Sequence, residues 1–600
     1  MSPRKALKCV GLLLTFFGMT ATASAQTPVT IDLGTLGGSQ SGAYAVNVNG
    51  QVVGAAALAG DAAAHAFSWT HVGGMVDLGT LGGIGSNASA VNDKGQVVGS
   101  ANVAGDAAAH AFSWTQAGGM VDLGTLAGTN SSNAVAVNAD GQVVGIAYTA
   151  NATFVHAFSW TRAGGMVDLG TLGGTYSRAS AVNDNGQVVG SADTAGGPHA
   201  FSWTHTGGMV DLGTLGGAVS GASAVNANGQ VVGYSLTAGS VETHAFSWTQ
   251  ASGMVDLGTL GGTDSDARAV NANGQVVGHA SIAADAANHA FSWTQVGGMV
   301  DLGTLGGSNS YATAVNDNGQ VVGYSLTAGD AAVHPFSWTQ AGGMVDLGTL
   351  GGTFSYALGM NAHGQVVGNS ATPEGPRRAV LWSAPPTVTL AVSSPVLTFD
   401  PAGAPVAFTV TSTRGTPTCA ADGSAFESGG ILPVGDHTIV CTATDPSTGL
   451  EGTASAAVSV VLSGPPGPPG PAGPVGPTGP AGPPGPAGSQ VWSSFVPSFG
   501  QVYTVAAFTP DTAITMTRIQ AQAAIGPSGC LVNPVVRVSD GTPGGIRTLT
   551  ISSAANDSGA FVVNYAAGVR ISVGVSTAAR CGLRATAPAL ANVVVQYHAR

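Results

Sequence analysis

Charged side chains are scarce in this sequence of 600 residues, of which only 8% are Asp, Glu, Lys or Arg. Lysine is almost absent, since Lys5, Lys8 and Lys94 are its only copies. The chain therefore lacks the basic patch that nucleic acids and anionic membranes require, and we expect neither as a partner. No apolar run after residue 25 reaches about 18 residues, so the sequence predicts no transmembrane span.

The first 25 residues have the composition of an export signal. A basic start with Arg4, Lys5 and Lys8 leads into the apolar run VGLLLTFFGM and the small-residue stretch TATASA. This order is typical of a secretory signal peptide, and we predict cleavage after Ala25. Removal of its three positive charges shifts the formal net charge from −13 to −16 (−13 − 3). We expect a secreted or cell-surface protein.

Cysteine is also rare, with five copies. Cys9 lies in the signal, and the other four form two well-separated pairs in the later part of the chain. An exported protein keeps disulfides, so Cys419–Cys441 and Cys530–Cys581 are the simplest bridges. We expect no cofactor and no metal site.

Glycine, in contrast, is abundant, with 92 copies, and much of it belongs to a repeat. The pentapeptide DLGTL starts at eight positions, separated by 43 to 46 residues: Asp32, Asp77, Asp122, Asp168, Asp211, Asp256, Asp301 and Asp346. Each unit holds four strand-like segments, as in Ala88–Asn92, Gln96–Ser100, His110–Thr115 and Met120–Leu126. Four short strands in 40 to 50 residues is the size of one β-propeller blade.

The repeat is offset at its two ends. The chain begins with a segment of the fourth type and ends the array with one of the third type, Ala379–Trp382. A ring repairs this offset, because the strand at Asp32 can pair with Ala379–Trp382 and complete the last blade. We therefore predict an all-β fold that begins with an eight-bladed β-propeller over residues 26–384, closed by the N-terminal strand. The alternative is an open solenoid, which has no need of a circular offset.

The repeat sequence HAFSW…GGMVDLGTLGG…AVN..GQVVG resembles that of the bacterial extracellular HAF-repeat family across residues 29–383. The resemblance implies a secreted or surface protein. Two units depart from the pattern: Pro335 follows His334, and the last unit has Arg378–Val380 in place of the tripeptide.

The repeated polar residues suggest metal sites, but a structural role explains them better. Seven histidines recur at one position of the unit: His65, His110, His156, His199, His244, His289 and His334. Equivalent positions on a ring lie too far apart to share one zinc ion. We expect them to form hydrogen bonds within each unit, together with residues such as Asp77, Ser113 and Trp114. The Asn of VNxxG, as in Asn92, would bind calcium or close its own turn, and the turn is favoured because no Glu follows.

The units differ mainly in the loops after DLGTLGG and in those before HAF, which share one face of the predicted ring. Aromatic and mixed polar side chains on such loops suit recognition of glycans or proteins, although neutral drift of surface loops would give the same variation. The candidate ligand-binding residues are Tyr44, Tyr176, Arg178, Asp264, Asp266, Tyr311, Phe354 and Tyr356.

Three further segments follow the repeats. Residues 385–463, with PTC…LPVGDHTIVCTATDPSTG, resemble the hyalin-repeat (HYR) module, which implies an immunoglobulin-like β-sandwich linked to adhesion. Residues 464–488 carry Gly at every third position, the pattern of a collagen triple helix of three chains, with a polyproline-type spacer as the alternative. Residues 489–600 predict a C-terminal β-sandwich or jelly roll that could act as a trimerisation head.

Together these features predict a non-enzymatic binding or adhesion protein that presents the propeller, as a homotrimer, to an extracellular glycan or protein. One alternative is a polysaccharide-active hydrolase or lyase, which needs unrepeated acid and base groups in a pocket, and no catalytic residues stand out. Another is a purely structural surface or matrix protein.

Overall fold

The computed structural model describes residues 17–22, 27–106, 108–126, 130–148, 155–239 and 241–463, and the strands within residues 489–599. Residues 17–463 belong to one compact unit and the strands of residues 489–599 to a second, and each unit is described by itself. The predicted collagen-like segment 464–488 and the predicted bridge Cys530–Cys581 lie outside the described residues.

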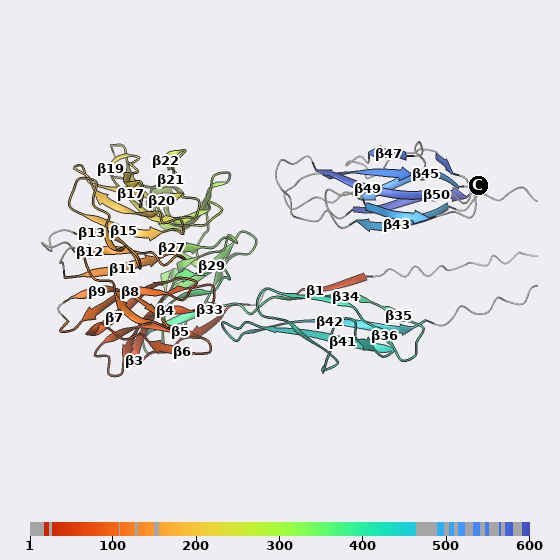
Figure 1. Cartoon of the computed structure of the whole chain (residues 1–600), viewed down its shortest axis with the longest axis horizontal. Coiled ribbons are helices and arrows are strands. Elements are labelled where there is room, and N and C mark those ends of the chain that lie inside the picture. Colours follow the sequence, from red (N-terminus) through yellow and green to blue (C-terminus); the bar gives the residue numbers. More distant parts are fainter. Residues whose placement is uncertain are drawn as a thin grey trace, which may run out of the picture. The chain divides into compact units, whose positions relative to one another are not determined.

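Eight four-stranded antiparallel sheets form the repeat region (Figure 1). We number them sheet 1 to sheet 8 in chain order. The first strands are β3 (Gly37–Val46), β7 (Gly82–Val91), β11 (Ser132–Val137), β15 (Ser177–Val182), β19 (Gly216–Val225), β23 (Gly261–Val270), β27 (Gly306–Val315) and β31 (Ser355–Met360). The second strands are β4 (Val52–Leu58), β8 (Val97–Val103), β12 (Val143–Tyr148), β16 (Val188–Asp193), β20 (Val231–Thr237), β24 (Val276–Ile282), β28 (Val321–Thr327) and β32 (Val366–Ala371).

The outer two strands of each sheet come from the HAFSW and DLGTL segments. The third strands are β5 (Ala64–Thr70), β9 (Ala109–Thr115), β13 (Val155–Thr161), β17 (Pro198–Thr204), β21 (Thr243–Thr249), β25 (Asn288–Thr294), β29 (Val333–Thr339) and β33 (Arg377–Ser383). The fourth strands are β6 (Gly74–Asp77), β10 (Gly119–Asp122), β14 (Gly165–Asp168), β18 (Gly208–Asp211), β22 (Gly253–Asp256), β26 (Gly298–Asp301), β30 (Gly343–Asp346) and, in sheet 8, β2 (Val29–Asp32). Each fourth strand ends at the Asp of DLGTL, earlier than the sequence predicts.

The N-terminal strand completes the last sheet. β2 pairs antiparallel with β33, in a register that puts Thr30 opposite Trp382 and Asp32 opposite Val380. The first strands of neighbouring sheets contact one another along the chain, and β31 of sheet 8 contacts β3 of sheet 1. The eight sheets therefore follow one another in a propeller-like order, and the last contacts the first.

The two valines of each QVVG segment explain how neighbouring sheets pack. Successive residues of a strand point to opposite faces of the sheet. Val97 packs in a cluster with Val53 of sheet 1, whereas Val98 packs with Val143 of sheet 3, and all of these valines are fully buried. Neighbouring sheets cover both faces of each sheet, and this explains why two consecutive residues of the QVVG segment are both valine. The Gly that follows is required, because a Cβ at Gly99 would overlap the carbonyl oxygen of Asn87.

A chain of buried asparagines links the sheets. The Oδ1 of Asn226 accepts from the backbone N–H groups of Asn228 and Gln230, both at 3.0 Å, and so closes the turn between the first two strands. Its Nδ2 donates across to the carbonyl of Asn271 in the next sheet at 2.9 Å. Seven such links are present at 2.8–3.0 Å, and the one from Asn361 of sheet 8 to the carbonyl of Asn47 of sheet 1 joins the two ends.

A second set of links uses a Ser that recurs in each first strand. The backbone N–H of Ala66 in sheet 1 donates to the Oγ of Ser86 in sheet 2 at 2.8 Å, and the pattern repeats to Ala379 of sheet 8, which donates to Ser41 of sheet 1 at 2.9 Å. Pro335 has no N–H to donate, and Ser355 instead donates to Ser370 at 2.6 Å. The departure from the repeat at Pro335 therefore changes one link between sheets 7 and 8.

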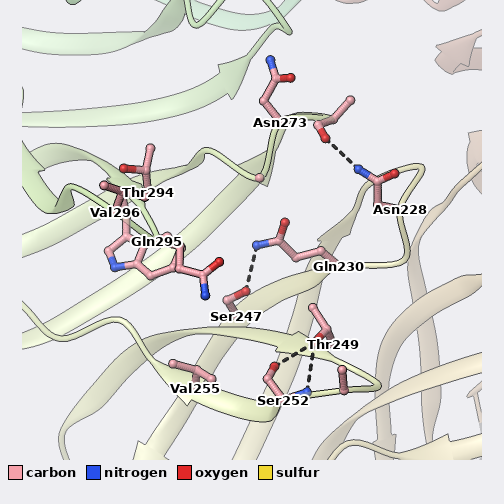
Figure 2. A pocket seen from close by; sticks show the side chains of 14 residues that line it. Asn228, Gln230, Ser247, Thr249, Ser252, Val255, Asn273, Thr294, Gln295 and Val296 are labelled. Carbon is pink, nitrogen blue, oxygen red and sulfur yellow. Dashed lines mark hydrogen bonds between the residues drawn. The ribbon is translucent and has the colours of Figure 1, made fainter. Parts of the chain in front are cut away.

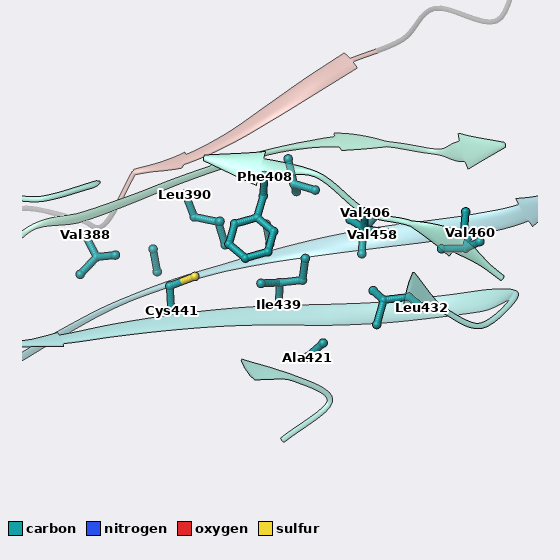
Figure 3. Packing of buried hydrophobic residues seen from close by; sticks show 14 of the residues in the cluster. Val388, Leu390, Val406, Phe408, Ala421, Leu432, Ile439, Cys441, Val458 and Val460 are labelled. Atoms are coloured by element: carbon teal, nitrogen blue, oxygen red, sulfur yellow. The ribbon is translucent and has the colours of Figure 1, made fainter. Parts of the chain in front are cut away.

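Residues 388–462 form a second set of sheets, which we call the Ig-like module after the fold that the sequence predicts for this segment; that fold stays a prediction. Its strands are β34 (Val388–Ser394), β35 (Val396–Thr398), β36 (Ala404–Pro405), β37 (Phe408–Ser412), β38 (Thr418–Ala421), β39 (Ser424–Ala425), β40 (Ile431–Leu432), β41 (Gly435–Thr444) and β42 (Glu451–Leu462). Leu390 of β34, Ile439 of β41 and Val458 of β42 share one buried core (Figure 3). The predicted bridge Cys419–Cys441 is present between β38 and β41.

β1 (Phe17–Thr22) lies inside the predicted export signal and pairs antiparallel with β34. Cleavage after Ala25 stays a prediction. The C-terminal unit contains two four-stranded antiparallel sheets, in the orders β43-β50-β45-β48 and β44-β49-β46-β47. Its strands are β43 (Ser489–Val496), β44 (Tyr503–Phe508), β45 (Ile514–Gln522), β46 (Val532–Ser539), β47 (Ile546–Thr550), β48 (Val563–Tyr565), β49 (Ile571–Ala579) and β50 (Ala591–Ala599). Two short 3-10 turns, η1 (Ala283–Asp285) and η2 (Ala328–Asp330), complete the described elements.

We expect the asparagine links to be a main source of ring stability. Asn226→Ala removes both turn bonds and the link to Asn271, and we expect the free energy of unfolding to fall by about 2–4 kcal/mol. Asn226→Asp keeps the turn acceptors but loses the donor, and its charge would face the Asn271 carbonyl, so we expect an equal or larger loss. Urea titration followed by Trp fluorescence measures this. The control Asn228→Ala removes an exposed bond from the same turn to the Ala272 carbonyl of the next sheet and should cost less than about 1 kcal/mol. Equal losses for the two positions would contradict the larger role of the buried link.

Candidate functional site

The recurrent histidines belong to the scaffold. The Nδ1 of each lies 2.8–2.9 Å from a carboxylate oxygen of the Asp that ends the fourth strand of the same sheet, as in His110 with Asp122. An ionised carboxylate only accepts, so Nδ1 carries the proton. Hydrogen bonding within each unit is confirmed, but the partner of His110 is Asp122, and Asp77 pairs with His65. The described residues contain no group of three side chains that could hold a metal ion.

Functional chemistry is therefore sought where the units differ. The antiparallel order puts the loops after DLGTL and those between the second and third strands at one end of every sheet, which we call the variable-loop end. The asparagine turns lie at the opposite end, the asparagine-turn end. Near the variable-loop end, one pair of cross-strand neighbours on the first and second strands changes from sheet to sheet. It is Gly42 with Ala55 in sheet 1 but Tyr311 with Tyr324 in sheet 7.

Sheets 6 to 8 carry large rings at or beside this position, and these rings form a continuous series. The ring of His279 in sheet 6 lies 4.9 Å from that of Tyr311 in sheet 7, which lies 5.2 Å from that of Tyr324. The ring of Tyr324 lies 5.0 Å from that of Tyr356 in sheet 8, and Phe354 follows at 6.4 Å. These spacings are typical of interacting aromatic pairs. We call these five half-buried side chains the aromatic row.

The aromatic row ends beside a cavity at the junction of sheets 8 and 1. The guanidinium of Arg377 lies 4.9 Å from the centre of the Phe354 ring, in a cation–π contact. Arg377 also lines a cavity of about 450 Å³, together with Tyr44, Asp61 and Asn369, which we call the seam pocket. The Oδ1 of Asn369 accepts from the backbone N–H of Ala43 in sheet 1 at 3.1 Å, which fixes the side chain across the junction.

Burial sets the charge state of this region. Burial lowers the pKa of His279 to about 4, with Arg268 adding to the effect and Asp264 opposing it. Burial also raises the pKa of the Tyr324 hydroxyl. At neutral pH His279 and Tyr324 are therefore uncharged, and they offer an imidazole N–H and a hydroxyl as donors. Next to it, Asp266 lies 3.0 Å from Arg268, and burial raises the pKa of its carboxyl while Arg268 opposes the shift. Its Oδ1 is buried without a hydrogen-bond partner.

The structure brings together some of the residues predicted from the sequence and separates others. Tyr311, Phe354 and Tyr356 belong to the aromatic row, Tyr44 lies in the seam pocket, and Asp266 lies opposite His279. Asp264 has a structural role, because its Oδ1 accepts from the backbone N–H of Thr243 in sheet 5 at 2.8 Å. Tyr176 and Arg178 lie on sheet 4, and the structure records no ring contact or ion pair between these described residues and the row.

Sequence reasoning missed His279, Tyr324, Asn369 and Arg377. The first three occupy the position after QVVG, which is Ala55, Ser100, Ile146, Ser191 and Tyr234 in other sheets. The variation of the residue at this position could have indicated a functional role. It was overlooked because the QVVG segment before it was interpreted as part of the packed core.

Grooves also occur at the asparagine-turn end. One between sheets 5 and 6 has a volume of about 810 Å³ and is lined by residues that include Asn228, Gln230 and Thr294 (Figure 2). A similar groove of about 530 Å³ lies between sheets 4 and 5. Within the first groove, Gln230 donates to Ser247 at 2.8 Å and Asn228 donates to the carbonyl of Ala272 at 2.7 Å. The first bond lies within sheet 5, and the second joins sheets 5 and 6.

No protein-family profile and no curated protein matches this chain. Among solved structures, a mutant of puromycin hydrolase complexed with PGG is similar over 60% of this chain, with 13% identity and a TM-score of 0.35. The match spans 59% of the length of that hydrolase. TolB from Acinetobacter baumannii is similar over 46% of this chain and 76% of its own, with 12% identity and a TM-score of 0.27. Similarity at this level assigns no activity. Within the described residues, no helix is long and apolar enough to cross a membrane.

The buried His279 makes a testable difference to acid stability. Because its pKa in the fold lies near 4, below the unfolded value of 6.5, the unfolded chain binds a proton that the folded chain excludes between these values. Stability should therefore fall as the pH drops from about 6.5 to about 4. We expect His279→Gln to show a smaller fall in Tm over this range than the wild type, in scanning calorimetry. His205→Gln, at an exposed position, should follow the wild type, and identical profiles for all three proteins would contradict the burial of His279.

Proposed function

We propose that this chain is an exported, non-enzymatic binding protein, and that its eight sheets form a closed eight-bladed β-propeller that presents a site for an extracellular glycan. The aromatic row carries this proposal. Four of its rings, from three neighbouring sheets, follow one another at 4.9–5.2 Å and end near a pocket with Arg377 and Asn369. Apolar ring faces beside a few fixed polar groups are the usual composition of a small-molecule site. A sugar combines apolar C–H faces with hydroxyls, and a protein ligand is the alternative.

The later segments suit a multivalent form of this protein. The HYR-like resemblance of residues 385–463 and the collagen-like period of residues 464–488 support an adhesion protein whose three propellers are held together. Weak sites that are linked in this way gain avidity without new contacts. Residues 489–600 would then form the trimerisation head.

Two other functions remain candidates for the same chain. Asp266 and His279 are unrepeated, lie opposite each other and have pKa values shifted by burial, which is typical of catalytic groups and favours a hydrolase or lyase as the second candidate. A purely structural surface protein would neither bind nor turn over a glycan.

Binding to a panel of immobilised polysaccharides separates these candidates. We expect the full chain to bind at least one of them saturably and without release of product, and Tyr311→Ala combined with Tyr356→Ala to weaken that binding about 10-fold or more. The control Tyr148→Ala removes an exposed Tyr outside the aromatic row and should bind as the wild type does.

The corresponding Phe variants test the chemistry further, because Tyr311→Phe and Tyr356→Phe keep the rings and remove only the hydroxyls. We expect these variants to lose less affinity than the Ala variants. Release of product by the wild type would support the enzyme instead. Binding that the double Ala variant leaves unchanged, in a protein with unaltered Tm, would contradict the site.

A further inference from the structure

The asparagine-turn end carries a recurrent amide–hydroxyl pair. In seven sheets the Gln of QVVG donates from Nε2 to the Oγ of the Ser in the third strand at 2.8–2.9 Å. The pairs are Gln51–Ser68, Gln96–Ser113, Gln142–Ser159, Gln187–Ser202, Gln230–Ser247, Gln275–Ser292 and Gln320–Ser337. In each of these sheets, the Gln amide therefore has a hydrogen-bond acceptor within its own sheet.

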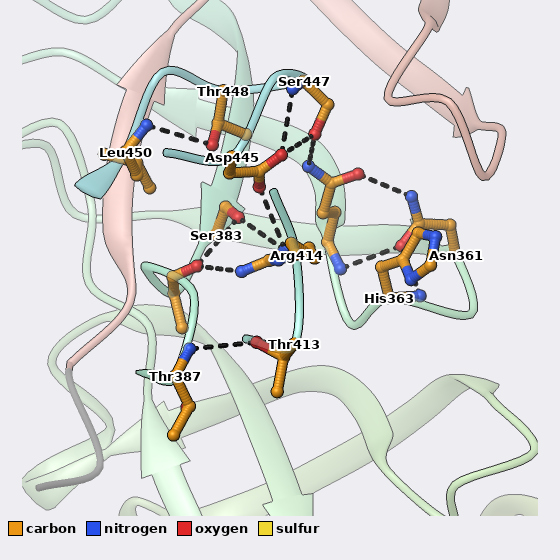
Figure 4. Close-up of polar contacts among 12 residues, drawn as sticks. Asn361, His363, Ser383, Thr387, Thr413, Arg414, Asp445, Ser447, Thr448 and Leu450 are labelled. Carbon is orange, nitrogen blue, oxygen red and sulfur yellow. Dashed lines mark hydrogen bonds and ion pairs between the residues drawn. The ribbon is translucent and has the colours of Figure 1, made fainter. Parts of the chain in front are cut away.

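Sheet 8 breaks this rule. Leu381 stands where the other sheets have Ser, because it lies opposite Val367 as Ser68 lies opposite Val53. Gln365 is fully buried, so an amide N–H without an acceptor would cost about 1–3 kcal/mol. The hydroxyl comes instead from the Ig-like module, since Gln365 Nε2 donates to the Oγ of Ser447 at 2.8 Å (Figure 4). This length equals that of the pairs inside the other sheets.

The turn that carries Ser447 sits across the junction of sheets 8 and 1. The Ser447 hydroxyl donates to Asp445 Oδ1 at 2.6 Å and accepts from Gln365, so it acts both as a donor and as an acceptor. On the side of sheet 1, a Cβ added at Gly50 would collide with the Ser447 side chain, and one at Gly449 would collide with the ring of His71. The corresponding groove between sheets 5 and 6 is lined by Gly274, Gln230 and Gln295, which occupy the repeat positions of Gly50, Gln365 and His71. The module thus fills, between sheets 8 and 1, the position that corresponds to the groove between sheets 5 and 6.

A second anchor lies beside the first. Arg414 of the module pairs with Asp445 at 3.3 Å, and both side chains are nearly buried, with 12% and 2% of their surface exposed. Arg414 also donates to Ser383 Oγ at 3.3 Å and to the carbonyl of Ala384. Ser383 ends β33 and lies opposite Val29 of the closing strand β2. Both anchors therefore touch the sheet in which the two ends of the repeat region meet.

We propose that the Ig-like module is a clamp that recognises sheet 8 by its missing hydroxyl and holds the ring closed. Leu381 and Gln365 determine the choice of groove, because in the seven other sheets the Gln amide already has its Ser partner. The partner that fits this surface is the chain's own Asp445–Gly449 turn. Docking at the asparagine-turn end also leaves the variable-loop end, with the aromatic row, open to solvent. The clamp rests on the closed ring proposed above, but not on the binding of a glycan.

Hydrogen exchange of the full chain, read by mass spectrometry, tests the clamp. Ser447→Ala deletes one hydroxyl on a turn and leaves the Gln365 amide without its acceptor. We expect exchange in residues 29–32 and 361–365 to become about 10-fold faster. Ser337→Ala is the matched control: it deletes the same partner from Gln320 within sheet 7, and exchange at residues 29–32 should not change. Ser447→Thr keeps the hydroxyl and should behave as the wild type.

A distance measurement gives an independent readout. Spin labels at Val296 of the ring and Phe399 of the module, both exposed, should report one narrow distance in the wild type and a broader distribution in Ser447→Ala. Unchanged exchange and an unchanged distance distribution in Ser447→Ala would overturn the proposal. An equal effect of Ser337→Ala at residues 29–32 would also overturn it, because the effect would then be a general loss of stability.

Discussion

The buried asparagine amide between neighbouring sheets is the interaction on which the rest of the structure depends. Each of these side chains closes its own turn through Oδ1, and in seven sheets its Nδ2 reaches an acceptor on the next sheet. The Gln of the same turn accepts one N–H of this amide. A buried second N–H without a partner is costly, so each of these seven sheets is stabilised by a neighbour on that side. In a linear array the Asn361 amide would keep only its bond to Gln365 Oε1 at 2.7 Å, whereas here it also donates to the carbonyl of Asn47 at 2.8 Å. The contact of sheet 8 with sheet 1 thus supplies the same bond that links six other neighbouring pairs of sheets.

The sequence predicted much of this scaffold because the repeat makes it visible. The offset between the first DLGTL and the last HAF-type segment indicated that Asp32 and Val380 belong to one sheet, and they lie opposite each other. The Cys419–Cys441 bridge followed from spacing. The partner of each His did not, because the register of the third and fourth strands decides between Asp77 and Asp122. His279 and Tyr324 were missed for a related reason: they meet Tyr311 across strands and sheets, which a linear pattern does not show.

The two ends of the sheets have different roles. At the asparagine-turn end the side chains recur and are used for links between sheets, and the one departure, Leu381, coincides with the docked Ser447. At the variable-loop end the recurrent Ser and His positions maintain the fold, while sheets 6, 7 and 8 add a series of rings that contact one another. An invariant scaffold with a local series of large side chains is the arrangement expected of a binding site placed on a stable frame.

The amide exchange rate of Leu33, compared with that of Leu78, tests the ring most directly. The two residues follow the fourth strands of sheets 8 and 1, and their backbone N–H groups donate to Ala379 and Ala66 at 3.0 and 2.9 Å. Leu78 bonds within one continuous unit, whereas Leu33 bonds to a residue almost 350 positions later in the chain. A closed ring predicts protection of the same order for both amides. Exchange of Leu33 at the rate of unpaired backbone, with Leu78 protected, would contradict closure and the account built on it.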